Sequence, residues 1–135
     1  WRSDTTFIAQ VSDSTGEVLL DNTPRPRLVL DPWAAASIND VLQGVINQGT
    51  ATNAQIGRPA AGKTGTTSSE RDIWFVGYVP QLSVAIWAGN DDNTPLRGRA
   101  TGGGFVAPAW KDFMQKALAN EPVIPFTPPS KFDRP

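Results

Sequence analysis

The chain has 135 residues, a formal net charge of -1, and neither cysteine nor histidine. The missing residue types exclude disulfide bonds, thiolate or imidazole metal sites and a Ser-His-Asp triad, so no metal or cofactor is expected. The sequence has no basic run with interleaved aromatic residues, so nucleic acid is not expected as a partner. It also has no signal peptide, lipidation motif or membrane-spanning apolar run, and its start at Trp1 without methionine leads us to expect a processed or cut chain.

The first third of the chain predicts a hairpin followed by a helix. Two β-prone runs, residues 7–11 and 17–20, flank a turn in which Gly16 can adopt a positive φ. Asp31 can cap a helix that begins with Pro32. Apolar residues at spacings of three and four predict one buried stripe on this helix, made by Ile38, Val41, Leu42, Val45 and Ile46.

Three strands are predicted after a polar loop, at residues 62–67, 73–79 and 82–89. The link between the second and third is too short for a crossover helix, so these two should pair antiparallel. Both are apolar at successive positions, which predicts cover on both faces and an antiparallel sheet packed between helices. Trp74, Trp87 and Trp110 are then expected in the core.

A second helix is predicted at about residues 108–119, followed by a proline-rich tail or linker at residues 121–135. Helices and an antiparallel sheet in this order indicate the α+β class.

Residues 57–64, Gly-Arg-Pro-Ala-Ala-Gly-Lys-Thr, match the phosphate-loop pattern G-x-x-x-x-G-K-[ST]. A phosphate loop follows a buried strand and opens a helix, whose first amides bind the phosphates. Here the match follows a polar loop and runs into residues 65–69, Gly-Thr-Thr-Ser-Ser, which are poor helix formers. We therefore interpret the match as accidental and keep a nucleotide-binding module only as an alternative.

The residues from Lys63 onward suit acyl transfer at a strand edge. A lysine beside a serine nucleophile can accept or relay its proton. The hydroxyls of Thr64 and Thr66 leave the same face of a strand and could hold a substrate carboxylate, with Thr67 adding a further hydroxyl. Gly65 lets a ligand approach the strand backbone, and the Thr66 amide could donate to the oxyanion of the intermediate.

The run Lys63-Thr64-Gly65-Thr66-Thr67 resembles the third active-site motif of the penicillin-binding serine D,D-transpeptidases. Flanking residues extend the resemblance to class A, bifunctional members over roughly residues 7–120: Ala61-Gly62, Asp72-x-Trp74-Phe75-x-Gly77-Tyr78, Trp87-x-Gly89, Gly102-Gly103, Ala107-Pro108-x-Trp110 and Phe113-Met114. The resemblance implies that residues 1–120 are the C-terminal part of a serine D,D-transpeptidase or β-lactamase-like fold. It also implies that Lys63 and Thr66 are catalytic and that residues 64–67 bind substrate.

Two motifs of this family are not found in the chain. No serine is followed by lysine three residues later, so the nucleophile motif Ser-x-x-Lys is missing. Ser37-Ile38-Asn39 matches Ser-x-Asn, but Ile38 belongs to the predicted buried stripe, so we interpret the match as accidental. Both motifs are therefore expected on an upstream segment or a companion chain.

For the whole enzyme, the resemblance implies that a serine attacks a D-Ala-D-Ala stem peptide to cross-link peptidoglycan, and that β-lactams acylate the same serine. Class A members also carry an upstream glycosyltransferase domain and a membrane anchor. The parent protein is thus expected at the extracytoplasmic face of the bacterial cytoplasmic membrane, although this chain has no anchor. The alternative is a noncatalytic fragment that only completes the fold.

Overall fold

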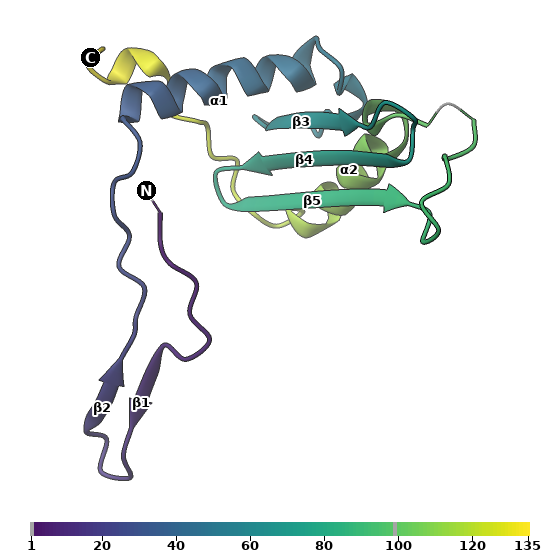
Figure 1. Ribbon diagram of the computed structural model, residues 1–135. Coiled ribbons are helices and arrows are strands. Elements are labelled where there is room, and N and C mark those ends of the chain that lie inside the picture. Colours follow the sequence, from purple (N-terminus) through teal and green to yellow (C-terminus); the bar gives the residue numbers. More distant parts are fainter. Residues whose placement is uncertain (1, 99) are drawn as a thin grey trace.

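The computed structural model describes residues 2–98 and 100–135, and it consists of a projecting arm and a body (Figure 1). The arm ends in the predicted hairpin, in which β1 (Gln10–Ser12) pairs antiparallel with β2 (Val18–Asp21). Gly16 has a φ of +89°, as the turn requires. The Asp13 carboxylate accepts hydrogen bonds from the Thr15 hydroxyl (2.7 Å) and the Glu17 amide (2.9 Å), which lower the pKa of Asp13.

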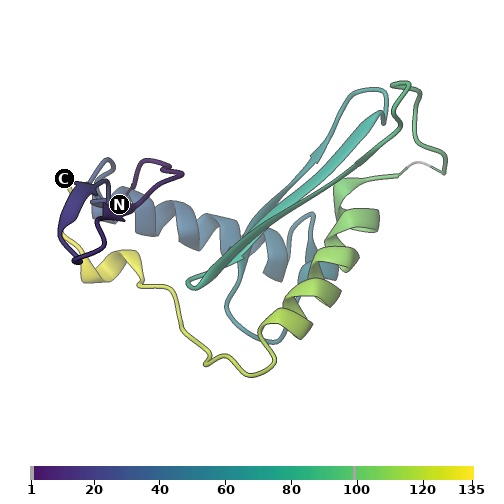
Figure 2. The ribbon, with the colours of Figure 1, turned by 90° about the horizontal axis from the view of Figure 1, so that it is seen from below.

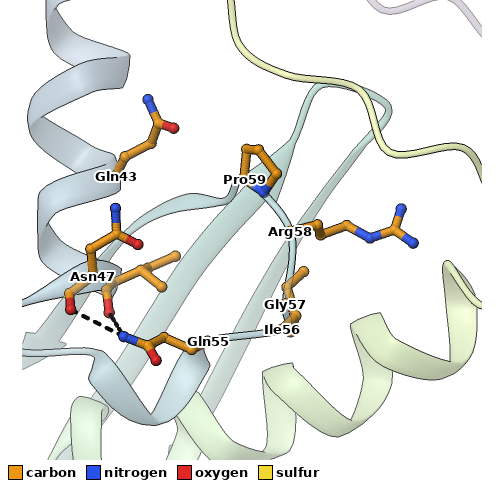
Figure 3. Close-up of a pocket in the computed structure, with 8 residues that line it drawn as sticks. Gln43, Asn47, Gln55, Ile56, Gly57, Arg58 and Pro59 are labelled. Carbon is orange, nitrogen blue, oxygen red and sulfur yellow. Dashed lines mark hydrogen bonds between the residues drawn. The ribbon is translucent and has the colours of Figure 1, made fainter.

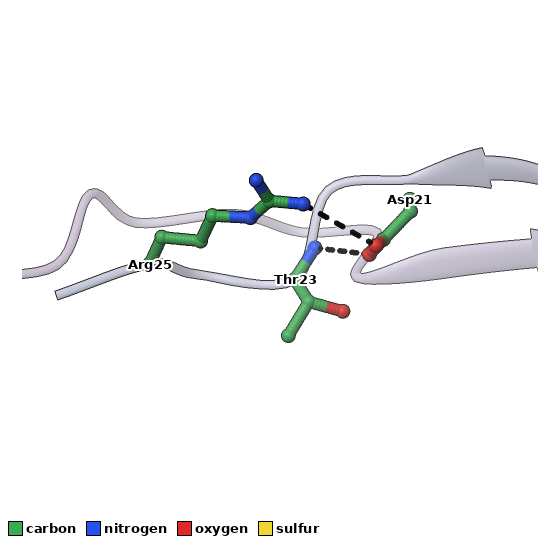
Figure 4. Close-up of polar contacts among 3 residues, drawn as sticks. All are labelled: Asp21, Thr23 and Arg25. Atoms are coloured by element: carbon green, nitrogen blue, oxygen red, sulfur yellow. Dashed lines mark hydrogen bonds and ion pairs between the residues drawn. The ribbon is translucent and has the colours of Figure 1, made fainter.

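After β2, local polar contacts around Asp21 order the chain (Figure 4). Its carboxylate accepts the Thr23 N–H at 2.9 Å and lies 4.0 Å from the Arg25 guanidinium. Hydrogen bonding from Thr23, and then the charge of Arg25, lower the pKa of Asp21. Because both side chains of this ion pair are exposed, the pair contributes little to stability.

The predicted first helix is α1 (Pro32–Asn47). The Asp31 carboxylate accepts the Ala34 N–H at 3.0 Å, so Asp31 is the expected N-cap and Pro32 occupies the first helical position. At the other end, the Gln55 side-chain amide donates to the carbonyls of Ile46 (3.2 Å) and Asn47 (3.0 Å), as Figure 3 shows. These bonds satisfy two of the carbonyls that a helix terminus leaves unpaired.

The body contains one antiparallel sheet in the order β3-β4-β5, formed by β3 (Ala61–Thr66), β4 (Asp72–Val79) and β5 (Leu82–Gly89). The predicted strands and the pairing of the last two are confirmed. A π-helical turn, η2 (Gly102–Val106), leads into the second helix, α2 (Ala107–Ala117).

Between α2 and one face of the sheet lies the core. Trp110 is fully buried, its ring lies edge-on to Phe75 with centroids 5.2 Å apart, and its indole N–H donates to the Val84 carbonyl at 3.2 Å. Ile73 and Met114 are also fully buried in this cluster. The predicted core position of Trp110 is thus confirmed, and it ties α2 to both β4 and β5.

Figure 2 views the sheet nearly edge-on, with α1 and α2 on its opposite sides. The Tyr78 hydroxyl, on the face away from α2, donates to the Asn39 carboxamide of α1 at 2.6 Å. The predicted α+β fold with an antiparallel sheet and flanking helices is therefore confirmed. However, α1 packs mainly against β3, so much of the sheet face on the side of α1 is uncovered in the described chain. On this face, Trp74, Val76 and Trp87 are 44%, 42% and 46% exposed. The prediction that Trp74 and Trp87 are core residues is wrong here, because both lie on the sheet face opposite α2, whereas Trp110 projects from α2 into the core.

The predicted buried stripe of α1 is only partly correct. Ile46 is buried, but Ile38 is 52% and Val41 is 70% exposed, and Ala36 is buried in their place. The helix contacts the sheet mainly along β3, with Asn39 reaching Tyr78 of β4. The side of α1 that carries Ala36 and Ile46 is covered, whereas the side that carries Ile38 and Val41 is not. The apolar residues of α1 therefore extend over a wider part of the helix surface than the sheet covers.

The proline-rich segment after α2 runs back along the body and ends beside α1, where η3 (Pro129–Lys131) lies (Figure 1). The Arg58 guanidinium fixes its start by donating to the carbonyls of Leu118 (3.0 Å), Glu121 (3.3 Å) and Pro122 (3.3 Å). Within residues 2–98 and 100–135, no helix combines the length and the apolarity needed to cross a bilayer.

Candidate functional site

All predicted site residues except Thr67 lie on β3, which is an edge strand of the sheet. Thr64 and Thr66 pair with Phe75 and Ile73, so their side chains share the face that α2 and η2 cover. Lys63 pairs with Val76 and therefore leaves the opposite face. The predicted common face of the two threonines is confirmed, and Lys63 is separated from them by the thickness of the strand.

The free edge of β3 is where these groups can meet. The Thr67 N–H donates to the Asp72 carbonyl at 3.0 Å. Because backbone groups alternate along an antiparallel strand, the N–H of Thr66 and the C=O of Thr64 face away from β4. The Lys63 ammonium folds over this edge and donates to the Thr64 carbonyl at 2.9 Å. A positive charge and an outward-facing amide therefore lie on the same strand edge.

A hydroxyl network lies beside this edge. The hydroxyl oxygens of Thr50 and Thr64 are 2.8 Å apart, and the Thr66 hydroxyl accepts the Gly102 N–H at 3.2 Å. The Asn53 side chain donates to the Gly103 carbonyl at 3.2 Å. The loop after α1, the strand β3 and the turn η2 are thus joined. Thr50 was not among the predicted site residues, because its contact with Thr64 joins two segments that lie 14 residues apart.

Gly102 and Gly103 make this network possible through close backbone contact. A Cβ on Gly102 would lie 2.3 Å from the Trp74 carbonyl oxygen, and a Cβ on Gly103 would lie 2.0 Å from the Thr50 carbonyl oxygen. Both distances are far below van der Waals contact, so η2 can reach β3 and the Thr50 loop only with glycine at these positions.

Two hydroxyl protons of this network are not used in its own hydrogen bonds and can be donated to a ligand. Each threonine hydroxyl has one proton and two lone pairs. One proton is used between Thr50 and Thr64, whereas Thr66 uses only a lone pair, because it accepts from Gly102. One proton of the Thr50–Thr64 pair and the Thr66 proton are therefore left to donate. Two O–H donors beside a lysine suit an anion with two oxygens, such as a carboxylate.

The Thr67 hydroxyl stabilises the turn that follows β3. Thr67 lies one residue beyond β3, and its hydroxyl accepts the backbone N–H groups of Arg71 and Asp72, both at 3.0 Å. These bonds close the turn between β3 and β4. The substrate-binding role expected for Thr67 therefore has less geometric support than the roles expected for Thr64 and Thr66.

The two accidental motif matches have structural explanations. Lys63 and Thr64 lie inside an extended strand, not at the start of a helix, so the phosphate-loop alternative is excluded. In the Ser-x-Asn match, the Ser37 hydroxyl donates to the Trp33 carbonyl at 2.8 Å, and Asn39 accepts from Tyr78. Both polar side chains are used in packing α1.

Two hollows in the described surface lie away from these residues. One of about 500 Å³ is lined by Gln43, Asn47 and the loop at residues 55–59 (Figure 3). Another of about 760 Å³ lies between Leu28, Ala36 and the C-terminal segment near Phe126. Neither is lined by the site residues of β3.

Comparisons with known proteins agree on one family. The family model for the penicillin-binding protein transpeptidase domain matches residues 3–115. Penicillin-binding protein 1A of Clostridium acetobutylicum is 39% identical over 120 residues, and that of Rickettsia bellii is 39% identical over 103 residues. The matched regions cover 87% and 76% of this chain, but only 14% and 13% of those relatives.

A solved structure has the same fold. The crystal structure of penicillin-binding protein 1A from Haemophilus influenzae matches with a TM-score of 0.63 and 24% sequence identity. The match covers 96% of this chain and 25% of that one. The chain thus corresponds to a minor part of much longer proteins.

Proposed function

Because the chain belongs to the penicillin-binding protein transpeptidase domain family, we propose that it supplies the lysine-bearing strand of a serine D,D-transpeptidase. The enzyme would cross-link peptidoglycan stem peptides and bind β-lactams. The observation that carries the proposal is the free edge of β3, where Lys63, the outward-facing Thr66 amide and the Thr50–Thr64–Thr66 hydroxyls lie together. Acyl transfer needs these groups: a cation for proton transfer, an oxyanion donor and a carboxylate-binding site.

In the proposed first step, a serine oxygen attacks the carbonyl carbon of the penultimate D-alanine of a stem peptide. The serine proton passes to a basic group, with Lys63 as electrostatic and proton-relay partner, and the Thr66 N–H donates to the oxyanion. The C–N bond to the terminal D-alanine then breaks, its nitrogen takes up a proton, and D-alanine leaves. The Thr64 and Thr66 hydroxyls hold the terminal carboxylate of the substrate.

In the second step, an amine of a neighbouring stem peptide attacks the acyl-enzyme ester. The C–O bond to serine breaks, the serine oxygen regains a proton, and a new amide joins the two peptides. The same serine would open the ring of a β-lactam, whose carboxylate takes the place of the D-alanine carboxylate.

We place the serine nucleophile and the Ser-x-Asn motif outside this chain, on an upstream segment or a companion chain. The exposed apolar groups support this division, because Trp74 and Trp87 on the sheet and Val41 on α1 are the kind of surface that a larger domain buries. Residues 1–120 would form the C-terminal part of the transpeptidase domain, and residues 121–135 a proline-rich tail. The parent protein would be membrane-anchored and act at the extracytoplasmic face of the cytoplasmic membrane, with a glycosyltransferase domain upstream.

A fluorescent penicillin tests this proposal. The sample is labelled, separated on a denaturing gel and measured by intact-mass spectrometry. Label on a longer polypeptide or a companion chain that contains Ser-x-x-Lys, lost when Lys63→Ala is introduced, would support the proposal. Label on this chain alone would contradict it, because a nucleophile would then lie within residues 1–135.

The second candidate is a noncatalytic fragment that completes the fold of another protein. The observation in its favour is the missing nucleophile motif together with the exposed apolar faces. It predicts that the chain associates with a companion that lacks Ser-x-x-Lys and that the complex is not labelled by penicillin.

A further inference from the structure

We infer that Thr50 is a positioning residue that orients the Thr64 hydroxyl for carboxylate binding. Its own hydroxyl is the partner of Thr64 at 2.8 Å, and it comes from the loop after α1. The inference rests on the proposed function, because it assigns a role within the same carboxylate site. It adds a residue from outside β3 to that site.

The position of Thr50 is fixed from two directions. Its carbonyl lies against Gly103, where any Cβ would lie 2.0 Å from the oxygen, and the next residue, Ala51, is fully buried. Asn53, three residues along the loop, donates to the Gly103 carbonyl at 3.2 Å. The Thr50 hydroxyl is therefore held by a packed backbone, although its side chain is exposed.

A fixed partner changes what Thr64 can do. A threonine hydroxyl on a strand edge can rotate, and a ligand that binds it must then restrict this rotation. In this structure, the bond to Thr50 already restricts the Thr64 hydroxyl, as the Gly102 N–H restricts Thr66. The two remaining O–H donors can then match the two oxygens of one carboxylate. Loss of Thr50 should weaken this match without removing either hydroxyl of β3.

The test uses Thr50→Val in the longer transpeptidase to which we assign the chain, because valine keeps the shape of threonine and removes the hydroxyl. Thr50→Ser keeps the hydroxyl, and Thr52→Val makes the same chemical change at an exposed position of the same loop. Acylation is measured with a penicillin that has a free carboxylate and with its methyl ester, over a range of concentrations. These pairs separate the loss of carboxylate binding from a general effect on the enzyme.

We expect Thr50→Val to reduce the acylation efficiency for the free acid by roughly 3- to 10-fold, the effect of one lost hydrogen bond. The loss should lie in the concentration for half-maximal rate, the methyl ester should be unaffected, and Thr50→Ser and Thr52→Val should behave like the wild type. Equal losses for acid and ester would overturn the inference, because they indicate a structural role. An unchanged Thr50→Val in an enzyme that prefers the acid would also overturn it, while leaving the proposed function intact. A wild-type enzyme that no penicillin acylates would contradict the proposed function itself, and the inference with it.

Discussion

Replacement of Gly102 by alanine should separate η2 from the sheet and destabilise the protein. The new Cβ would lie 2.3 Å from the Trp74 carbonyl oxygen and 2.8 Å from the Gly65 carbonyl oxygen. Both are main-chain atoms of one cross-strand pair between β3 and β4, so neither can rotate away as a side chain would. Either the sheet or η2 must move.

The size of the effect follows from these contacts. Overpacking at a tight site costs about 1–3 kcal/mol. A shift of η2 would also lose the bond from the Gly102 N–H to the Thr66 hydroxyl (3.2 Å), worth about 0.5–1.5 kcal/mol. We therefore expect the free energy of unfolding to fall by roughly 2–4 kcal/mol. Gly44→Ala in α1 is the matched control, because its Cβ would meet nothing within 4 Å. That change should stabilise the protein by about 0.5–1 kcal/mol.

Urea unfolding followed by tryptophan fluorescence measures both variants against the wild type. A Gly102→Ala variant within about 0.5 kcal/mol of the wild type would refute the reasoning, because an overlap with fixed backbone atoms cannot be relieved at so small a cost. The same result would mean that η2 does not lie against the β3–β4 pair. Opposite signs for the two glycine substitutions would show that packing, and not helix or loop propensity, decides the outcome.

Three further changes test other parts of the fold. Trp110→Ala removes the fully buried indole between α2 and the sheet. It should lower the free energy of unfolding by about 3–5 kcal/mol, measured by urea unfolding with circular dichroism. A loss below about 1 kcal/mol would contradict the core described here. Asp31→Ala should cost about 1 kcal/mol through loss of the bond to the Ala34 N–H, whereas Asp31→Asn should restore most of it. Tyr78→Phe should cost about 0.5–1.5 kcal/mol at neutral pH, because the bond to Asn39 is lost. Burial raises the pKa of Tyr78 above its ordinary value, so the folded state disfavours ionisation and the wild type should lose stability as the pH rises above about 10. The thermal midpoint of Tyr78→Phe should therefore fall less above about pH 10 than the midpoint of the wild type. If the midpoints of both proteins fall in parallel with pH, ionisation of Tyr78 does not contribute to the loss of stability.

Local sequence signals were enough to predict the order of elements in the body. Asp31-Pro32 marked the start of α1, and the alternation of strands and short links predicted the antiparallel sheet, because caps, turns and strand periods depend on residues close in the chain. The run from Lys63 to Thr67 was sufficient to indicate the family, since its residue types and spacing are specific.

Burial was predicted less well, because it depends on what packs against an element. Trp74 and Trp110 both occur in apolar segments, yet Trp110 is fully buried and Trp74 is 44% exposed. Trp110 projects from α2 onto the sheet, whereas Trp74 lies on the face of β4 that α2 does not cover. Which face of β4 is covered depends on the pairing of the strands and on the placement of α2, which begins more than thirty residues later. In the same way, Val41 fits the apolar period of α1 but lies on the side that β3 does not reach.

The sequence by itself determined the local elements, the lysine motif and the common face of Thr64 and Thr66, because a strand alternates its side chains whatever surrounds it. Only the tertiary structure decided that Thr50 meets Thr64 and that Gly102 lies over β3. These contacts join segments 14 and 36 residues apart, and they exist because η2 and the loop after α1 close on the same strand edge. The chemistry of the candidate site was therefore readable from a short motif, whereas the contacts that orient its hydroxyls required the folded chain.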